Sequence, residues 1–415
     1  MVEIITIGDE LLIGQVVDTN SAWMARELNQ AGFEVNRITS VSDRKEEIQE
    51  ALESAARRAK IVLMTGGLGP TRDDITKQTL CDFFNTRLVF NEEVYNDIRE
   101  FLKGRVKNIN QLNRDQAMVP EKCMVIRNKL GTAPVMWFEY NNSVVVSMPG
   151  VPAEMKLAMT DEIIPRLKEK YEPGVIIHKT VLIYNIPEAV LAEKLTGWEE
   201  QLPDEIKLAY LPAPGRVRLR LTTRGNDPDA LRKSIQKAVD ALYPIVGENI
   251  YGEEDQPASE IFANYFRSTG KTIALAESCS GGYLAHLITM VPGSSDYFKG
   301  SMVTYSNDLK INILGVKPED IENYGAVSRQ VVEQMALGAV RIAESDYAIA
   351  ISGIAGPGGG SEEKPVGTVW MAWAGPGNKV VSKEFRFGKE RERNIVQTSE
   401  TALIELMRLM KQGIL

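Results

Sequence analysis

A turn of small residues near residue 280 carries two potential nucleophiles. Ser278 and Cys279 follow the apolar segment 272–276 and precede Gly281, where an apolar helical pattern begins. A nucleophile at a strand-to-helix turn lies close to backbone N–H groups that can stabilise a developing oxyanion. The alternative is that Ser278 and Ser280 only cap the helix. The spacing alone does not choose between Ser278 and Cys279.

The base for such a nucleophile is not expected to be a histidine. The chain has two, His178 in a predicted strand and His286 on an apolar helical stretch, where a packed or solvated histidine is the usual outcome. Lys310 lies downstream of the turn, and a desolvated, neutral lysine can activate a serine hydroxyl. Lys310 could equally be a solvated helix lysine. Tyr305, at the end of an apolar strand, either orients the serine and lysine or fills the core.

Two further segments are candidates for substrate contact. Ser352 ends a predicted strand and opens the glycine-rich stretch 353–360, whose backbone can approach a ligand closely. A disordered linker is the alternative for this stretch. Arg391 and Arg393 follow Gly388 at the start of the last predicted helix, where a guanidinium can bind a phosphate. Solvated surface arginines are the commoner case.

A second group of polar residues, nearer the N-terminus, is typical of a phosphate and metal site. Gly66, Gly67 and Gly69 follow a predicted strand and allow backbone N–H groups to approach a phosphate. Carboxylates from several strand ends beside such a loop suit a hard divalent cation. The predicted ligands are Asp9, Glu10, Asp43 and Asp74. Helix capping is the alternative for Asp43 and for the pair Asp73-Asp74.

The elements that must position these residues form three segments. Strand and helix patterns alternate in residues 1–171, and the same alternation returns in residues 253–415, which indicates two α/β domains with mostly parallel or mixed sheets. Residues 172–252 predict a strand, a helix, two strands and a helix, which make a small α+β connecting domain. Loops that follow parallel strands line one edge of a sheet, so the residues of each group can meet there.

The bulk composition restricts the class of protein. The 415 residues are 44% hydrophobic and 25% charged, which is typical of a globular protein with more than one domain. A net charge of −8 argues against nonspecific nucleic-acid binding. No segment approaches the roughly 20 apolar residues of a membrane span, and three cysteines without ligand spacing fit a reducing compartment. We expect a cytoplasmic protein that acts on small molecules and does not contact membranes.

Several N-terminal motifs occur together in one order. They are Gly8-Asp9-Glu10-Leu11-Leu12, Gly14 with Asp18-Thr19-Asn20, Thr65-Gly66-Gly67-Leu68-Gly69-Pro70-Thr71 with Asp73-Asp74, Asn128 with Gly131-Thr132-Ala133-Pro134, and Pro149-Gly150-Val151-Pro152. Together they resemble the molybdopterin-binding-like domain of the CinA (competence-damage-inducible) family. The resemblance implies an ADP-ribose pyrophosphatase with Mg²⁺, Mn²⁺ or Co²⁺ at the four carboxylates. The implied substrate contacts are Gly66, Gly67, Gly69, Thr71, Pro149 and Gly150. Val135 departs from the pattern, because the family usually has glycine there.

The C-terminal motifs resemble the other end of the same family. They are Ala276-Glu277-Ser278-Cys279-Ser280-Gly281-Gly282, Tyr305-Ser306-Asn307 with Lys310, Gly325-Ala326-Val327-Ser328, Ser352-Gly353-Ile354-Ala355-Gly356-Pro357 and Pro365-Val366-Gly367-Thr368-Val369. The resemblance implies a nicotinamide mononucleotide deamidase that needs no cofactor, with Ser278 as nucleophile, Lys310 as base and Tyr305 as an auxiliary hydroxyl. The implied substrate contacts are Ser280, Gly281, Gly282, Ser352, Gly353 and Arg391. Arg393 remains the alternative to Arg391, because the local spacing is one residue longer than usual.

The middle segment resembles the small KH-like domain that joins the two halves in this family. KH domains that bind nucleic acid use a Gly-x-x-Gly loop, and residues 175–250 contain none. We therefore expect a structural role for this segment and no nucleic-acid partner. For the whole chain we expect a homodimer with two separate sites. Two alternatives stay open: an N-terminal half that binds a nucleotide or molybdopterin-like ligand without turnover, and a DNA-associated competence factor.

Overall fold

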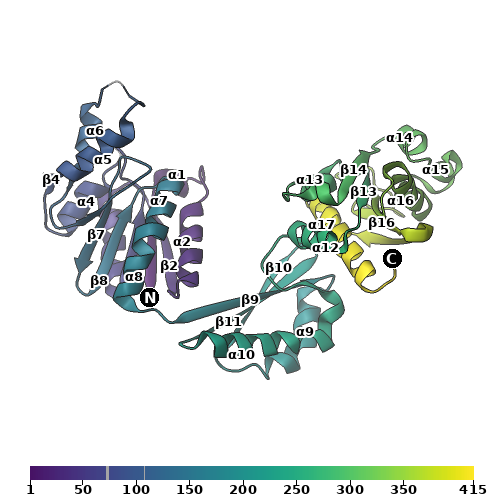
Figure 1. Cartoon of the computed structure of the whole chain (residues 1–415), viewed down its shortest axis with the longest axis horizontal. Coiled ribbons are helices and arrows are strands. Elements are labelled where there is room, and N and C mark those ends of the chain that lie inside the picture. Colours follow the sequence, from purple (N-terminus) through teal and green to yellow (C-terminus); the bar gives the residue numbers. More distant parts are fainter. Residues whose placement is uncertain (72–73, 107) are drawn as a thin grey trace. The chain divides into compact units, whose positions relative to one another are not determined.

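The computed structural model of the chain describes residues 1–71, 74–106 and 108–415. They form two compact units, one of Met1–Ile177 with Thr223–Arg232 and one of His178–Thr222 with Lys233–Leu415. Figure 1 shows sheets flanked by helices at both ends of the chain, with a smaller sheet in the segment between them. In the described part of the chain, no helix is long and apolar enough to cross a membrane.

The N-terminal domain is built on a six-stranded mixed sheet. Its elements are β1 (Val2–Ile7), α1 (Asp9–Leu12), α2 (Thr19–Gln30), β2 (Val35–Val41), α3 (Lys45–Arg58), β3 (Ile61–Thr65), α4 (Thr76–Phe83), β4 (Leu88–Phe90), α5 (Glu92–Leu102), α6 (Gln111–Asp115), β5 (Met118–Pro120), β6 (Met124–Ile126), β7 (Val135–Tyr140), β8 (Ser143–Met148), α7 (Pro152–Ala158), the π-helix η1 (Met159–Ile163) and α8 (Ile164–Tyr171). The strand order is β2-β1-β3-β8-β7-β6. Strands β1, β3 and β8 are buried along their whole length, as expected for central strands covered on both faces.

Four strands of this sheet end at the same edge. Strands β2, β1, β3 and β8 run parallel; β7 pairs antiparallel with β8, and β6 pairs antiparallel with β7. The loops that follow the four parallel strands therefore leave from one edge, and they carry the predicted phosphate and metal residues. Gly66 allows two of these loops to approach closely. Its φ is +116°, and a Cβ there would lie 2.1 Å from the carbonyl oxygen of Ile7.

The middle domain is a four-stranded antiparallel sheet with two longer helices. Its elements are β9 (Val175–Tyr184), α9 (Glu188–Glu199), β10 (Lys207–Ala213), β11 (Arg216–Gly225), α10 (Pro228–Asp240), α11 (Tyr243–Val246), the 3₁₀ turn η2 (Gly247–Asn249) and β12 (Ile250–Gly252), with strand order β10-β11-β9-β12. Alternate residues of β11, among them Val217 and Leu219, are buried, so one face of the sheet packs inward. Trp198 Nε1 donates to the carbonyl of Ala238 at 3.0 Å and ties α9 to α10.

The C-terminal domain is a five-stranded mixed sheet. Its elements are α12 (Ala258–Thr269), β13 (Ile273–Glu277), α13 (Tyr283–Thr289), η3 (Ser294–Asp296), β14 (Phe298–Val303), α14 (Asn307–Asn312), α15 (Pro318–Tyr324), α16 (Arg329–Ala343), β15 (Tyr347–Gly353), β16 (Thr368–Gly375), η4 (Pro376–Asn378), β17 (Lys379–Arg386) and α17 (Arg391–Lys411). The strand order is β14-β13-β15-β16-β17, and the first three strands run parallel. Ser278 follows β13 and Tyr305 follows β14, so both lie at the carboxyl edge. The predicted fold class, with mixed α/β sheets and a small α+β domain, is confirmed.

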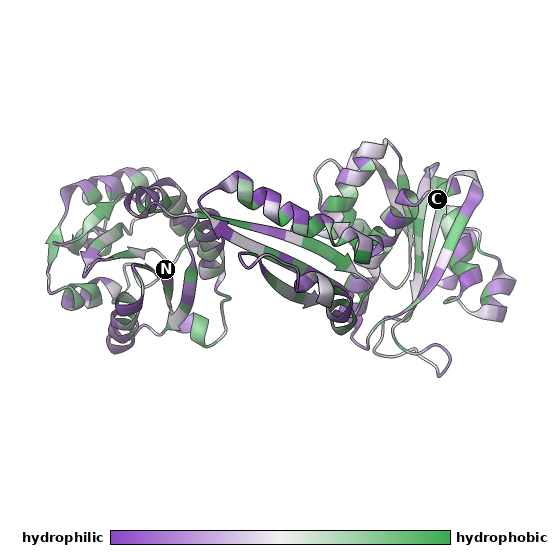
Figure 2. Cartoon of the chain, turned by 90° about the horizontal axis from the view of Figure 1, so that it is seen from below, coloured by the Kyte–Doolittle hydropathy of each residue, from purple (hydrophilic) through white to green (hydrophobic). Residues whose placement is uncertain are grey.

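The two faces of the C-terminal sheet are packed differently. One face buries large side chains against α12, α13 and α17, including Phe262, Phe266 and Trp373. The other face meets α16 mainly through alanines, among them Ala274 and Ala348, so α16 can lie close to the strands. Figure 2 shows hydrophobic residues along the strands and alternating hydrophobic and hydrophilic residues on the helices. The sheet thus forms a rigid base for the loops at its edge.

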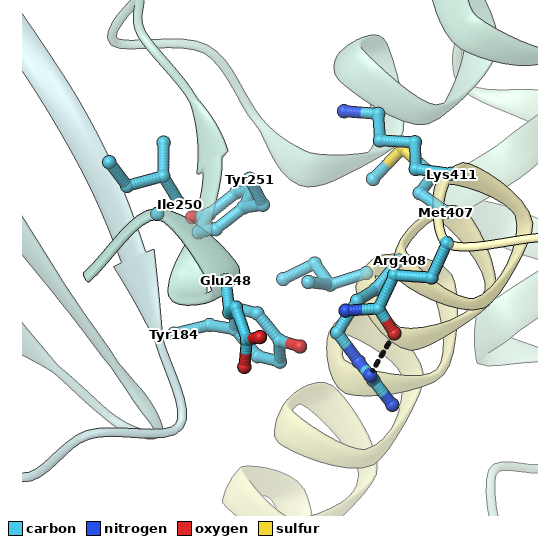
Figure 3. A pocket seen from close by; sticks show the side chains of 10 residues that line it. Tyr184, Glu248, Ile250, Tyr251, Met407, Arg408 and Lys411 are labelled. Atoms are coloured by element: carbon cyan, nitrogen blue, oxygen red, sulfur yellow. Dashed lines mark hydrogen bonds between the residues drawn. The ribbon is translucent and has the colours of Figure 1, made fainter. Parts of the chain in front are cut away.

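A cavity lies where the middle domain meets α17, within the second unit. It has a volume of about 130 Å³. Its inner wall is apolar and aromatic, with Tyr184, Tyr251 and Met407, and its rim carries Glu248 and Arg408 (Figure 3). This cavity is lined by none of the residues predicted for either site.

We predict that Gly338 on α16 tolerates no side chain. A Cβ there would lie 2.2 Å from the carbonyl oxygen of Leu314, so Gly338→Ala should destabilise the chain by about 1–3 kcal/mol. The matched control is Gly197→Ala on α9, where no atom lies within 4 Å of the added Cβ; it should leave stability unchanged or raise it by up to about 1 kcal/mol. Urea unfolding followed by circular dichroism measures both, and equal midpoints would contradict this packing.

Candidate active sites

The structure brings the predicted nucleophile and base together. Lys310 Nζ lies 3.2 Å from Ser278 Oγ. It also lies 2.8 Å from the carbonyl oxygen of Thr304 and 3.3 Å from that of Tyr305. Only 1% of Lys310 is exposed, although it sits on the short helix α14. Its burial lowers the pKa of the ammonium group below the ordinary lysine value.

The three oxygen atoms around Lys310 fit both protonation states of the amine. A neutral amine has two N–H bonds and one lone pair. The carbonyls of Thr304 and Tyr305 can accept the two N–H bonds, which leaves the lone pair for the hydroxyl proton of Ser278. A protonated amine has three N–H bonds and can donate to all three oxygens. The surroundings of Lys310 therefore accommodate a proton without rearrangement.

Ser278 and Cys279 are almost equally buried, and their different contacts separate the roles of the two candidate nucleophiles. Cys279 belongs to the hydrophobic core beneath the turn, and its desolvation raises the pKa of its thiol to about 12. A Cβ added to Gly353 would lie 3.0 Å from Cys279 Sγ, so the thiol packs against the end of β15. Since the thiolate is the reactive form of cysteine, this environment favours Ser278 as the nucleophile.

Arg391 connects two of the loops at this edge. Its Nη1 donates to the carbonyl of Gly356 at 2.8 Å, and its Nη2 donates to Tyr305 Oη at 3.1 Å. Arg393 is exposed, and its side chain forms no hydrogen bond to another described residue. Asn394, which no motif indicated, donates to the carbonyls of Ala355 and Gly388 and fixes the start of α17. Of the two arginines left open by the sequence, Arg391 is the one beside Tyr305.

Several residues predicted to contact substrate already have partners within the protein. Ser280 Oγ and the N–H of Gly282 both donate to the carboxylate of Glu277. The N–H of Gly281 donates to the carbonyl of Ser278. Ser352 Oγ donates to the carbonyl of Ala326 at 2.7 Å, and Gly353 provides close packing between β15 and β16. Their assignment as substrate contacts stays a prediction.

Glu277 is a residue of this site that the sequence reasoning missed. It is fully buried at the end of β13, directly before Ser278. Its carboxylate accepts hydrogen bonds from two hydroxyls and three backbone N–H groups. The standard capping-box pattern would not reveal it, because that pattern places the carboxylate inside the first helical turn, whereas Glu277 precedes the helix.

The glycine-rich loop of the N-terminal domain lies against the turn that follows β8. Thr65 Oγ1 donates to the carbonyl of Pro149 at 2.8 Å, and the N–H of Gly66 donates to the carbonyl of Met148. A Cβ on Gly150 would lie 3.4 Å from the Cα of Gly66. The two motifs, 84 residues apart in the sequence, thus form one wall.

The predicted metal-binding carboxylates are electrostatic neighbours at this edge. The N–H of Asp9 donates to Asp43 Oδ2 at 3.0 Å, and the N–H of Asp43 lies 3.4 Å from Asp9 Oδ1. Burial raises the pKa of Asp43, and the charges of Asp9, Glu10 and Asp74 raise it further, against a lowering by the Asp9 N–H. Asp74 accepts from both the N–H and the hydroxyl of Thr71. Asp73 lies outside the described residues.

The chemistry of these groups fits a hard divalent cation. Their oxygens are the ligands that Mg²⁺ prefers, and their mutual repulsion is what a cation would relieve. Within the described residues, no three His, Cys, Asp or Glu side chains converge on one metal position. Mg²⁺ is often held by one or two carboxylates, with water and substrate phosphates supplying the remaining ligands. Asp43 and its neighbours meet that smaller requirement.

The departure at Val135 lies at the start of a strand, outside the loop that precedes it. Val135 is the first residue of β7 and is completely buried in the core. The preceding loop is held by Asn128, whose Nδ2 donates to the carbonyl of Ala133 and to Glu154. The valine therefore contributes to strand packing.

Sequence comparisons cover the chain in three successive parts. Residues 3–169 match the profile described as "Probable molybdopterin binding domain", residues 178–252 the "Damage-inducible protein CinA KH domain" and residues 255–410 the "CinA C-terminal domain". A CinA-like protein of Flavobacterium psychrophilum is 45% identical over 96% of both chains. The chain belongs to the CinA family.

Other CinA relatives extend this match. A CinA-like protein of Cytophaga hutchinsonii is 44% identical over 99% of this chain and 98% of its own. Among solved structures, the competence/damage inducible protein CihA from Agrobacterium tumefaciens is 41% identical, covers 37% of this chain and 93% of its own, and gives a TM-score of 0.36. The predicted family resemblance is thus confirmed for the whole chain, and the CinA fold holds both candidate sites.

We predict that the thiols are nearly unreactive in the folded protein. Burial raises the pKa of Cys123 and of Cys279 to about 12 and raises that of Cys81, so at pH 8 only about one Cys279 thiol in 10⁴ is a thiolate. Ellman's reagent should release little colour from the native protein within minutes and about three equivalents after denaturation in guanidinium. A fast thiol mapped to Cys279 by mass spectrometry would contradict the assigned roles of Ser278 and Cys279.

Proposed function

We propose that the C-terminal domain is an amidohydrolase that deamidates nicotinamide mononucleotide to nicotinic acid mononucleotide and ammonia. The observation that carries this proposal is the position of Lys310, a buried amine 3.2 Å from Ser278 Oγ with two carbonyls around it. Membership of the CinA family supports the choice of substrate, since the resemblance implies this activity. The burial of Cys279 in the hydrophobic core, which raises the pKa of its thiol, supports a serine rather than a cysteine mechanism.

The proposed reaction needs only these two residues for its proton transfers. Ser278 Oγ attacks the carboxamide carbon while its proton passes to Lys310 Nζ, and the carbonyl electron pair moves to the oxygen. When the intermediate collapses, the C–N bond breaks and Lys310 returns the proton to the leaving nitrogen, so that ammonia departs. Water then attacks the acyl-enzyme with Lys310 as base, the ester bond breaks, and Ser278 recovers its proton.

The charge that develops on the carbonyl oxygen needs donors near Ser278. The N–H of Ser280 has no acceptor within the described chain, whereas the N–H groups of Gly281 and Gly282 are already bonded. We therefore assign the oxyanion contact to the backbone just after the nucleophile. Arg391, held by Gly356 and Tyr305, is the proposed contact for the substrate phosphate.

Ammonia release from nicotinamide mononucleotide tests this proposal. Ser278→Ala and Lys310→Met should each lower kcat by at least about 10³-fold, because the nucleophile and its base act as a unit. Cys279→Ala is the matched control beside the nucleophile and should stay within a few-fold of wild type. Full activity of the serine or lysine variant would reject the mechanism.

The pH dependence provides a second check on the same reaction. Only the neutral form of Lys310 can accept the proton, so the rate should rise with pH through the pKa of the folded-state lysine. Because burial lowers that pKa, the rate should level off below the ordinary lysine value of about 10.4. Chelators should leave the rate unchanged, and loss of deamidation on chelation would contradict a Ser–Lys mechanism.

For the N-terminal domain we propose hydrolysis of ADP-ribose to AMP and ribose 5-phosphate with a divalent metal ion. The grouping of Asp9, Glu10, Asp43 and Asp74 beside a glycine-rich loop supports this second activity. When bound, the cation would stabilise negative charge on the pyrophosphate. Asp43 and Asp9 would hold it, and the backbone around Gly66 and Gly67 would bind the phosphate oxygens.

Formation of AMP from ADP-ribose, followed by chromatography with Mg²⁺, Mn²⁺ or Co²⁺, tests this activity. Asp43→Asn should lower the rate by at least about 100-fold, because a bound cation contributes several kcal/mol to such reactions. Asp161→Asn, an exposed carboxylate of the same domain that pairs with Lys129, is the control. Ligand binding without AMP formation would instead favour a binding module.

A DNA-associated role is the rival function that the relatives' names suggest. Three basic residues of the middle domain form ion pairs with carboxylates of the same unit, so part of its positive charge is neutralised. The ion pairs are Lys179 with Glu253 and Glu254, Arg216 with Glu400, and Arg218 with Asp255. A phosphate backbone would have to compete with these carboxylates, which argues against this role. Salt-sensitive DNA binding at physiological ionic strength would favour it.

A further inference from the structure

The carboxylate of Glu277 sits at the centre of the turn that carries Ser278. Its Oε2 accepts from Ser280 Oγ at 2.8 Å and from the N–H groups of Gly282 and Leu284 at 3.0 and 3.1 Å. Its Oε1 accepts from the N–H of Ala285 at 3.0 Å and from Ser301 Oγ at 2.9 Å. Both oxygens are thus saturated by donors from three elements: the turn, α13 and β14.

Burial of the Glu277 carboxylate is unfavourable in free energy unless all of its hydrogen bonds are formed. Glu277 is fully buried, and a carboxylate loses strong hydration when it leaves water. Five hydrogen bonds, several of them from the N-terminal N–H groups of α13, replace that hydration. The same N–H groups would otherwise lack partners inside the protein. Carboxylate and turn therefore stabilise each other in one geometry.

The geometry that Glu277 enforces includes the position of the nucleophile. Ser278 follows Glu277 directly, and its own N–H is bonded to the carbonyl of Ile351 on β15. Gly281 and Gly282 have φ values of +61° and +96°, which let the chain fold back over the carboxylate. Ser301 ties the carboxylate to β14, the strand that leads to Tyr305 and Lys310. The nucleophile and its base are thus connected through Glu277 as well as through the sheet.

We propose that Glu277 is a positioning residue, which fixes the Ser278 turn at the distance from Lys310 that proton transfer requires. The proposal rests on the proposed function in one respect, that Ser278 is the nucleophile. Glu277 does not reach the substrate, because its oxygens are buried and fully engaged. Its effect is to prevent the turn from relaxing, since a displacement of about 1 Å can cost about 100-fold in rate.

The reactivity of Ser278 toward an alkyl fluorophosphonate tests this proposal without a natural substrate. In this reaction the Oγ–P bond forms, the P–F bond breaks, fluoride leaves, and the serine proton passes to Lys310. The rate is followed by intact mass spectrometry, with Ser278→Ala as the blank. Glu277→Gln keeps the shape of the side chain but replaces one accepting oxygen by an NH₂ group, which cannot accept the hydrogen bonds that the carboxylate oxygen receives. We expect it to react at least about tenfold more slowly than wild type while it remains folded.

Two hydroxyl variants separate positioning from general stability. Ser301→Ala removes one donor of Glu277 from outside the turn and should slow labelling about threefold. Ser382→Ala is the matched control, because it removes a strand serine bonded to Glu333 in the same domain, away from Ser278; it should label at the wild-type rate. If Glu277→Gln does not fold, the comparison of Ser301→Ala with Ser382→Ala decides.

The outcomes distinguish this proposal from the proposed function. Wild-type labelling rates in folded Glu277→Gln, or in Ser301→Ala when Glu277→Gln is unfolded, would overturn the positioning role. Labelling of Ser278 without deamidation of nicotinamide mononucleotide would reject the substrate and leave the role of Glu277 testable by the same rates. Absence of labelling at Ser278 in the wild type would reject the nucleophile and the positioning role with it.

Discussion

The C-terminal site depends on the burial of the Lys310 amine, which is removed from water when the protein folds. Water would hold a lysine amine in its protonated form, in which it has no lone pair to accept the serine proton. The interior weakens this preference, because burial disfavours the charged form and lowers the pKa of Lys310. The surrounding strands and α14 keep water out, and two carbonyls satisfy the N–H bonds of the neutral amine. The packing of the domain therefore determines the environment of the amine beside Ser278.

Much of this architecture follows from local sequence patterns. The sequence predicts one strand directly before Gly66 and another that ends at Ser352, and the structure has β3 (Ile61–Thr65) and β15 (Tyr347–Gly353) there. The parallel strands then determine where the polar residues of each site lie, since the loops that follow these strands share one edge of the sheet. This rule brings Ser278 beside Lys310, and it brings the loops with Asp43 and Gly66 to one edge. The sequence pattern left open whether Lys310 lies on a helix and did not indicate α15, because few apolar positions mark either segment.

The contacts that refine each site are set by tertiary packing and were not predictable in this way. Glu277 bonds to N–H groups up to eight residues later and to Ser301 on another strand, so no local motif encodes its role. Cys279 and Ser278 are neighbours in sequence and almost equally buried, and only their contacts differ, the apolar core for the thiol and the Lys310 amine for the hydroxyl. Arg391 and Arg393 likewise differ in what they contact. In each case the sequence shows the type of the residue, whereas its contacts are seen only in the folded structure.

The oxygens that receive the Lys310 N–H bonds belong to the main chain of Thr304 and Tyr305. Every amino acid supplies such a carbonyl, so the environment of the base is insensitive to the identity of the residues that form it. Side chains at the rim of the site can therefore diverge over evolutionary time while the amine keeps its anchoring.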